Sequence, residues 1–181
     1  MASLVDRMMR ASKIEVNLYE EVEADKGAMG QAISVVVIVS VAAGIGAIAY
    51  TGISGLILGT IVALISWFIW AYLIFLVGTK LLPEPETKSD VGELLRTIAF
   101  ANSPGVLRVL GFIPFLGGII VFVTAIWILV ATVIAVRQAL DYKSTWRAVG
   151  VCIIAAIIVM IISWLLFSVL NVPNPFVPSV A

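Results

Sequence analysis

One arginine of this 181-residue chain stands apart from the other charged residues. Arg108 lies in the stretch FANSPGVLRVLGFIP, and long apolar segments flank that stretch on both sides. An arginine near the centre of a bilayer costs about 3 kcal/mol or more. Asn102 and Ser103 precede it, and no Asp or Glu lies in a neighbouring apolar segment to pair with it. These three residues are a candidate contact for an anionic lipid or ligand; the alternative is that Arg108 snorkels towards the cytoplasmic interface.

Little else in the sequence indicates catalysis. The chain has no His, which is the commonest general base and metal ligand. Its single cysteine, Cys152, lies in an apolar run, and no paired acidic residues occur in the apolar segments. The net charge is zero, so no basic patch indicates nucleic-acid binding. We therefore expect no catalytic residue, no metal site, no cofactor and no nucleic-acid partner.

The composition indicates an all-α membrane protein. Hydrophobic residues make up 62% of the chain and charged residues only 12%, which is too apolar for a water-soluble domain of this size. A helix that spans the hydrocarbon needs roughly 20 apolar residues. Four runs meet this length, at about residues 30–50, 56–82, 116–136 and 149–170, with a tight turn expected at 51–55 between the first two.

The basic residues argue for a fifth crossing. Lys and Arg gather before the first run, after the second and after the third, and cytoplasmic segments are enriched in these residues. With four crossings, the basic segment 137–147 would fall outside, whereas a fifth crossing within residues 97–113 keeps every basic segment inside. We therefore expect five crossings, with a cytoplasmic N-terminus and an outside C-terminus.

The expected third span is short and interrupted. Ser103 is suited to cap a new helix, Pro104 to occupy its first turn, and Pro114 to end it. Such broken backbone is tolerated in a membrane only where protein or water satisfies its polar groups. The expected fold is a five-helix bundle with a broken third helix that lies against the other helices.

Two amphipathic helices are expected beside the spans. Asp90 and Glu93 form a capping-box pattern, and an apolar stripe follows it at helical spacing. This helix lies either at the membrane interface or against other helices of the protein. Residues 4–13 form a second such helix, whose basic side chains could touch anionic headgroups. The expected organisation is a cytoplasmic segment 1–29, a membrane domain 30–170 and a Pro-rich tail 171–181 outside.

Small residues at helical spacing indicate close helix packing. Gly55 and Gly59 form a GxxxG pair, and Ser40 and Gly44 have the same spacing in the first span. We expect these residues to pack the first two spans against each other; homodimerisation is the alternative.

Three stretches resemble the Yip1-domain family, especially its short prokaryotic members. They are LYEEVEADKGAMGQAI at residues 18–33, AFANSPGVLRVLGFIPFLGGI at 99–119 and VRQALDYKSTWRAVGVCI at 136–153. The resemblance implies a five-helix protein of the prokaryotic cytoplasmic membrane with a cytoplasmic N-terminus. Eukaryotic members bind small GTPases of the Rab type and have a motif like Asp-Leu-Tyr-Gly-Pro. The segment from Asn17 to Glu21 matches only its Leu-Tyr core, so small-GTPase binding is not expected.

The sequence thus predicts a non-enzymatic membrane protein that organises or binds lipids or membrane proteins, including the possibility of an accessory subunit of a larger complex. Its expected partners are membrane lipids and other membrane proteins or further copies of itself. The alternative function is a small transporter or channel in which Arg108 binds an anionic ligand.

Overall fold

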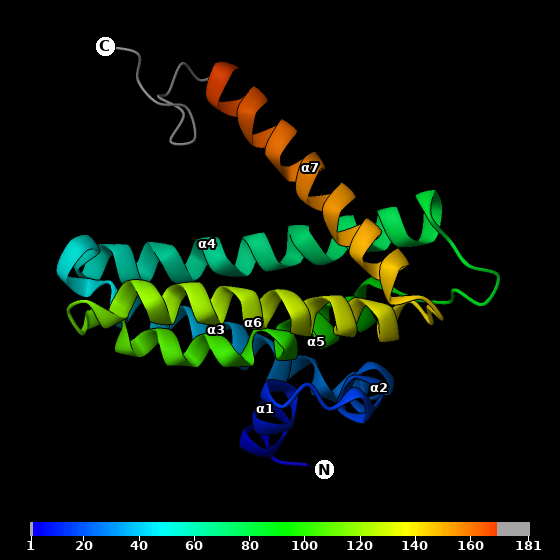
Figure 1. Cartoon of the computed structure of the whole chain (residues 1–181), viewed down its shortest axis with the longest axis horizontal. Helices are drawn as coiled ribbons and strands as arrows, with labels where there is room; N and C mark the ends of the chain where they lie inside the picture. Colours follow the sequence, from blue (N-terminus) through cyan, green and yellow to red (C-terminus); the bar gives the residue numbers. More distant parts are fainter. Residues whose placement is uncertain (1, 170–181) are drawn as a thin grey trace.

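The computed structural model describes residues 2–169, and all of its regular elements are helices (Figure 1). The elements are α1 (Leu4–Ser12), α2 (Val16–Ala24), η1 (Lys26–Ala28), α3 (Met29–Gly46), α4 (Ile48–Leu76), η2 (Val77–Leu81), α5 (Val91–Ala101), η3 (Ser103–Phe112), α6 (Leu116–Ala139) and α7 (Thr145–Val169). The expected Pro-rich tail lies outside the described residues.

Helices α3 and α4 form an antiparallel hairpin (Figure 1). The chain reverses at Ala47, and Gly52 then kinks the start of α4 with a φ of 65°. Glycine adopts this left-handed region without the cost that a Cβ imposes. The break at Gly52 lies inside the turn expected at residues 51–55, although the reversal begins earlier, at Ala47, and helical residues flank the break on both sides.

The next segment consists of α5 and η3, which follow each other with a change of helix type. Both reciprocal hydrogen bonds of the predicted capping box form between Asp90 and Glu93. Every residue of α5 from Leu94 to Ala101 is buried, so α5 packs among the other helices of the protein. Residues Ser103–Phe112 continue as a 3₁₀ helix alongside α3 and α6.

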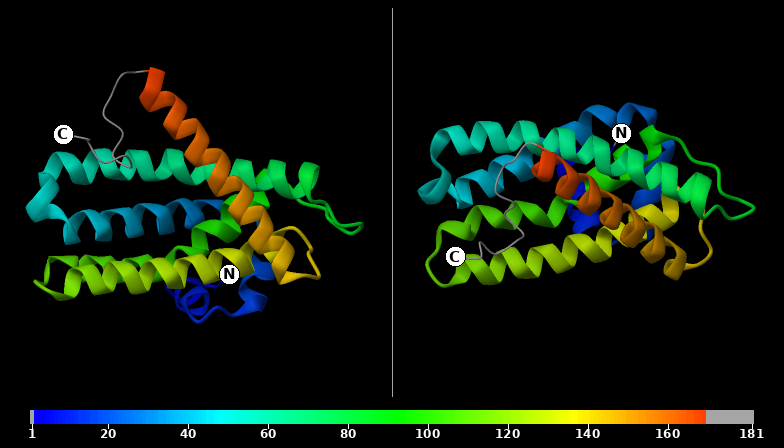
Figure 2. Two further views of the ribbon diagram at one scale, coloured as in Figure 1. Left: turned by 45° about the horizontal axis from the view of Figure 1, so that its top comes forward. Right: turned by 90° about the horizontal axis from the view of Figure 1, so that it is seen from above.

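Helix α7 leaves the bundle at an angle (Figures 1 and 2). Its first half packs through Ala148, Val151, Cys152 and Ala155, all of them buried. Its second half diverges from α4 and α6 and exposes large apolar side chains such as Met160 and Trp164. In the loop before it, the hydroxyl of Tyr142 shares its one proton between the backbone carbonyls of Gly78 and Leu82, which ties this loop to η2 at the end of α4.

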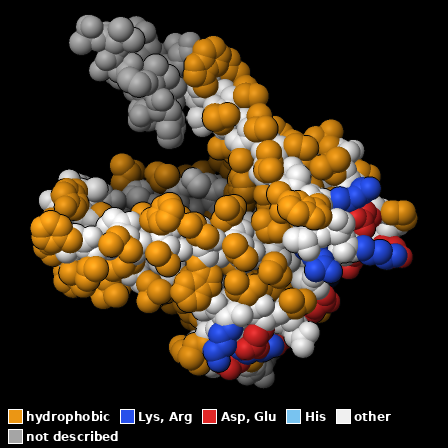
Figure 3. All heavy atoms as spheres, viewed as in Figure 1, with side chains coloured by type: hydrophobic (Ala, Val, Ile, Leu, Met, Phe, Trp, Pro, Cys, Tyr) orange, Lys and Arg blue, Asp and Glu red, His pale blue; other side chains and the backbone are white. Residues whose placement is uncertain are grey.

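Charged and apolar side chains separate along the long axis of the bundle (Figure 3). Lys, Arg, Asp and Glu gather around α1, α2 and the two loops that precede α5 and α7. We call this the charged end. The opposite end, where α3 turns into α4 and η3 into α6, carries no charged residue, and we call it the uncharged end.

Within residues 2–169, four helical segments are long and apolar enough to cross a membrane. They are Lys26–Gly46, Ile48–Leu81, Leu116–Ala139 and Thr145–Leu165. The protein is accordingly a multi-pass membrane protein. The fifth crossing stays a prediction, because α5 and η3 are each too short to cross alone.

Candidate anion-binding site inside the helix bundle

Close backbone packing fixes the position of η3 in the bundle. A Cβ placed on Gly46, the last residue of α3, would lie 2.0 Å from the carbonyl oxygen of Arg108. Similarly, a Cβ on Gly105 would lie 2.6 Å from a methyl group of Val39. These two glycines allow η3 to approach α3 directly. The backbone of Arg108 therefore lies level with the last turn of α3, near the uncharged end.

The side chain of Arg108 points away from that end, into the bundle. Its Nε donates a hydrogen bond of 3.1 Å to Oγ1 of Thr124, which lies two turns into α6. The Thr124 hydroxyl in turn donates to the backbone carbonyl of Ile120 at 2.8 Å. The bond to Thr124 is the one hydrogen bond of the Arg108 guanidinium to another described residue. No described carboxylate forms an ion pair with this guanidinium. Arg108 therefore reaches Thr124 instead of snorkelling to an interface.

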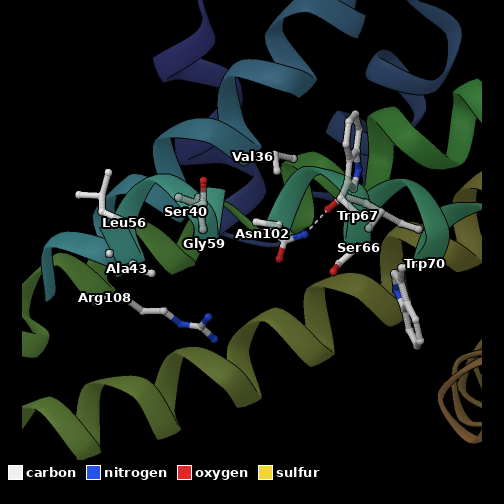
Figure 4. A pocket seen from close by; sticks show the side chains of 15 residues that line it. Val36, Ser40, Ala43, Leu56, Gly59, Ser66, Trp67, Trp70, Asn102 and Arg108 are labelled. Atoms are coloured by element: carbon white, nitrogen blue, oxygen red, sulfur yellow. Dashed lines mark hydrogen bonds between the residues drawn. The ribbon is translucent and has the colours of Figure 1, made fainter. Parts of the chain in front are cut away.

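A cavity of about 410 Å³ receives the guanidinium (Figure 4). Arg108, Asn102 and Ser66 point into it from η3, the C-terminus of α5 and α4. The Asn102 side-chain amide nitrogen donates to the carbonyl of Ile98 at 2.8 Å, which leaves its oxygen to accept a bond in the cavity. Trp67 and Trp70 close the side nearest the charged end, and the indole of Trp67 is fixed by a 3.1 Å bond to the carbonyl of Leu95.

Small residues of α3 and α4 provide the space of this cavity. Its wall includes Ala43, Gly44, Gly55, Gly59 and Ala63. At Gly44 the two helices are close, because a Cβ there would lie 3.0 Å from the side chain of Leu56. No described atom lies within 4 Å of a Cβ placed on Gly59. The predicted packing role thus suits Gly44, whereas Gly59 faces open space.

Two further cavities adjoin the first one, and Arg108 lines all three. One, of about 560 Å³, lies at the uncharged end between the turn after α3 and the turn before α6. The other, of about 290 Å³, lies between α4, α6 and α7, and includes Thr132 and Cys152. Arg108 is the only charged residue between Arg96 and Arg137. The segments between Lys26 and Lys80 and after Arg147 contain no charged residue. Arg108 is thus the one cation that lines these three neighbouring cavities.

Ser103 does not belong to this site. Its hydroxyl donates to the backbone carbonyl of Phe100 at 2.6 Å, and it does not cap η3. The side chain is buried and lines a different, apolar cavity beneath α1. The predicted cap was wrong because the hydroxyl satisfies a carbonyl of the preceding helix instead. Pro104 does occupy the first turn of η3, while Pro114 follows its end.

Sequence reasoning missed part of the lining. Nothing in the local sequence singles out Ser66, Thr124 or Thr132. In the structure Ser66 and Thr132 line two of the cavities around Arg108, and Thr124 accepts its hydrogen bond. Trp67 and Trp70 carried no sequence signal beyond their apolar surroundings. Their spacing of three residues on α4 places both on one face, but which face meets α5 depends on the tertiary packing.

The charged end contrasts with this site, because the arginines of α1 are paired with carboxylates. The Arg7 guanidinium, predicted as a possible headgroup contact, is buried and bonds Glu21, Gln31 and Asp25 at 2.8–3.0 Å. Hydrogen bonds from Arg10 hold the pKa of Glu21 below its ordinary value. Both arginines of α1 are therefore bonded within the protein, whereas Lys13, just past the end of α1, has no ion pair with a described residue.

The pKa of Glu23 shifts in the opposite direction to that of Glu21. Burial, together with the nearby carboxylates of Glu93, Asp141 and Glu20, raises its pKa to about 8. The Arg96 guanidinium, also buried, donates a 2.7 Å bond to the backbone carbonyl of Val22 and a second bond to that of Glu23. These bonds fix the C-terminal end of α2 onto α5. They leave the Glu23 side chain itself without a hydrogen-bond donor from Arg96.

The described residues contain no cluster of His, Cys, Asp or Glu that could hold a metal ion. The chemistry that the Arg108 site offers is hydrogen bonding and charge attraction. The free guanidinium nitrogens of Arg108, with Ser66 and Thr132 in the cavity walls, suit an anion such as a phosphate group.

The family model of the Yip1 domain matches residues 17–167 of the chain. Neither a curated protein sequence nor a solved structure matches it. In this structure the Leu-Tyr pair of the N-terminal resemblance, Leu18 and Tyr19, is fully buried in α2, where the Tyr19 hydroxyl donates to the carbonyl of Ala11. The match extends from α2 to α7 and includes the whole Arg108 site. The chain belongs to the Yip1 domain family of membrane proteins.

Proposed function

We propose that this protein is a non-enzymatic membrane protein that binds an anionic lipid at Arg108. The observation that carries the proposal is a guanidinium inside the bundle whose one described bond is to the neutral hydroxyl of Thr124. A charge of this kind is costly in hydrocarbon unless a partner compensates it. A lipid phosphate is the anion that a membrane supplies in quantity, and arginine binds phosphate with two parallel hydrogen bonds.

The shape of the site supports a lipid. The cavity that receives the guanidinium, of about 410 Å³, falls in the size range of small-molecule sites, roughly 300–1,000 Å³. The cavities around Arg108 open between helices that expose apolar side chains. Leu129 lines the smaller cavity and is 60% exposed, so an acyl chain can follow the surface of α6 while the headgroup meets Arg108. Asn102 and Ser66 then provide neutral hydrogen bonds for ester or glycerol oxygens.

We further propose that α5 and η3 together form a fifth crossing. Eleven α-helical residues rise about 16 Å and ten 3₁₀ residues rise about 20 Å. Their sum exceeds the hydrocarbon thickness of roughly 30 Å. With this crossing, every basic loop lies at the charged end, which faces the cytoplasm by the positive-inside rule, and the uncharged end faces the other side.

The test is lipid retention after mild detergent extraction, measured by native mass spectrometry. We expect the wild-type protein to retain an anionic phospholipid, and Arg108→Gln to lose it. Lys88→Gln is the matched control, because it removes one positive charge from an exposed loop residue. Equal retention by wild type and Arg108→Gln would refute the proposal. The same spectra would detect a stoichiometric membrane-protein partner, which an organising or accessory role requires.

The second candidate function is a small transporter for an anion. The cavities that meet at Arg108 favour it, since they extend from the uncharged end towards the middle of the bundle. A liposome flux assay that compares wild type with Arg108→Ala separates this function from simple lipid binding. Flux that is absent, or that does not depend on Arg108, would rule it out.

A further inference from the structure

One of the cavities around Arg108 opens at the uncharged end. The cavity of about 560 Å³ lies directly at the uncharged end, where its lining includes Tyr50 and the turn Ile113–Phe115. Tyr50 is 88% exposed and Phe115 is 98% exposed, so this cavity reaches the surface of the protein. Ala43 lines both this cavity and the one that contains the guanidinium. The two cavities are therefore neighbours, and together they mark a route from the uncharged end past Ala43 to Arg108.

A layer of core residues closes the opposite direction. One helical turn beyond Trp70, Ile98 and Thr132, towards the charged end, the chain places Ile74, Leu94 and Val136. All three of these side chains are fully buried. Leu140 and Tyr142 complete this part of the core, in which Tyr142 binds the end of α4. The packed layer separates the Arg108 cavities from the charged end.

The charge pattern favours an anion along this route. The described part of the uncharged end has no acidic residue that would repel an anion and no cation other than Arg108 that would hold it earlier. Exposed Phe112 and Phe115 surround the opening with apolar surface. An amphiphile can therefore keep its acyl chains in the hydrocarbon while its anionic group moves towards the guanidinium.

We propose that the Arg108 site is loaded from the uncharged end and not from the charged end, by the phosphate-type headgroup of a lipid from the leaflet at the uncharged end. This inference rests on the proposed function and adds to it the side of entry and the leaflet that supplies the ligand. The site then samples the lipid of one leaflet and is closed to the other by the core of the charged end.

Single reporter cysteines test the route in a Cys152→Ala background. Ala43→Cys and Ser40→Cys lie along it, and Ser40→Cys is nearly isosteric, so the test does not depend on one variant that folds. Phe115→Cys marks the uncharged end and Lys88→Cys the charged end. The reporters are reacted in phosphatidylcholine vesicles with a membrane-impermeant anionic thiosulfonate or its cationic counterpart.

We expect both route reporters to react from the side on which Phe115→Cys reacts. The anionic reagent should react about tenfold faster than the cationic one, because the two approach a guanidinium in a poorly screened site with opposite charges. Arg108→Gln should abolish this preference. Adding phosphatidylglycerol to the vesicles should protect the route reporters several-fold, whereas inorganic phosphate in the buffer should not.

The outcomes separate the two proposals. Reaction from the side of Lys88→Cys would overturn the direction of loading and leave lipid binding at Arg108 intact. Protection by inorganic phosphate alone would overturn the lipid headgroup as the ligand. Protection by phosphatidylglycerol that persists in Arg108→Gln would overturn the role of Arg108 and with it the proposed function.

Discussion

Arg7 and Arg96, the two buried arginines at the charged end, differ from Arg108 inside the bundle in the number of hydrogen-bond partners that the protein provides. Arg7 is bonded by two carboxylates and an amide, and Arg96 by two backbone carbonyls at the end of α2. Arg108 has one described bond, to a hydroxyl. The first two arginines connect α1, α2 and α5, so their partners are supplied by the fold. Arg108 connects η3 to α6 by a single hydrogen bond to Thr124, and no described residue neutralises its charge.

This difference shows how a buried charge can be assigned to structure or to function. A buried charge with a complete set of partners stabilises one arrangement of the chain, and loss of one member leaves the others unsatisfied. A buried charge with an incomplete set costs stability until a ligand supplies the missing partner. Substitutions at the three arginines should therefore affect stability and ligand binding in opposite order.

Arg7→Ala is expected to have the largest effect on stability. It leaves Glu21 and Asp25 without their shared cation beneath α1, and we expect a loss of about 2–3 kcal/mol in the free energy of unfolding. Denaturation in detergent micelles, with limited proteolysis of the N-terminal segment, measures it. Lys13→Ala is the control and should have no measurable effect. An Arg7→Ala protein as stable as wild type would contradict the partner-set interpretation.

Arg96→Met keeps the apolar stem and removes the donors to the carbonyls of Val22 and Glu23. We expect a loss of about 2 kcal/mol, because two buried acceptors lose a charged donor. Increased amide hydrogen exchange in α2, with α6 unchanged, would locate the effect. Exchange that increases equally in all helices would instead indicate a general loss of packing.

Glu23→Gln tests the pH dependence of the same region. The folded protein keeps a proton on Glu23 up to a pKa of about 8, whereas the ordinary value is 4.5. Wild-type stability should therefore fall as pH rises from 4.5 to about 8 and then stay constant, by roughly 1 kcal/mol after allowance for the partial exposure of Glu23. The variant should lose this slope. The lowered pKa values of Glu21 and Asp25 act in a separate window, below their ordinary values.

Arg108→Leu should change stability least, within about 0.5 kcal/mol or in the stabilising direction, since it replaces a poorly partnered charge by an apolar side chain. Thermal denaturation in neutral detergent measures this. Addition of phosphatidylglycerol should raise the melting temperature of wild type and leave that of Arg108→Leu unchanged. A strong loss of stability in neutral detergent would place Arg108 with Arg7 and Arg96 as a structural residue.

Several features followed directly from local sequence. Asp90 and Glu93 lie at the spacing of a capping box, and the box forms. Runs of apolar residues predicted the four long membrane helices, since length and composition alone decide whether a helix can cross. The turn expected at residues 51–55 contains the break at Gly52, but the chain is helical on both sides of it, because the small residues there permit either a turn or a helix.

The composition of the site was less predictable. Arg108 and Asn102 were found because a cation and an amide are rare in apolar segments. Ser103 was wrongly included, since its hydroxyl bonds the preceding helix and faces another cavity. Thr124 and Ser66 were absent from the prediction, because hydroxyl residues are common in membrane helices and nothing local says which of them face a cation.

The sequence by itself determined that this chain is an apolar, all-helical membrane protein with a single charged residue inside its apolar segments. Charge and hydrophobicity are properties of each residue, and membrane insertion depends on their sum along short windows. Only the tertiary structure decided that Arg108 points into the bundle, because the approach of η3 to α3 depends on glycines far apart in sequence, at 46 and 105. The cavity exists for the same reason: it is the space left between small residues of several helices, which no single segment encodes.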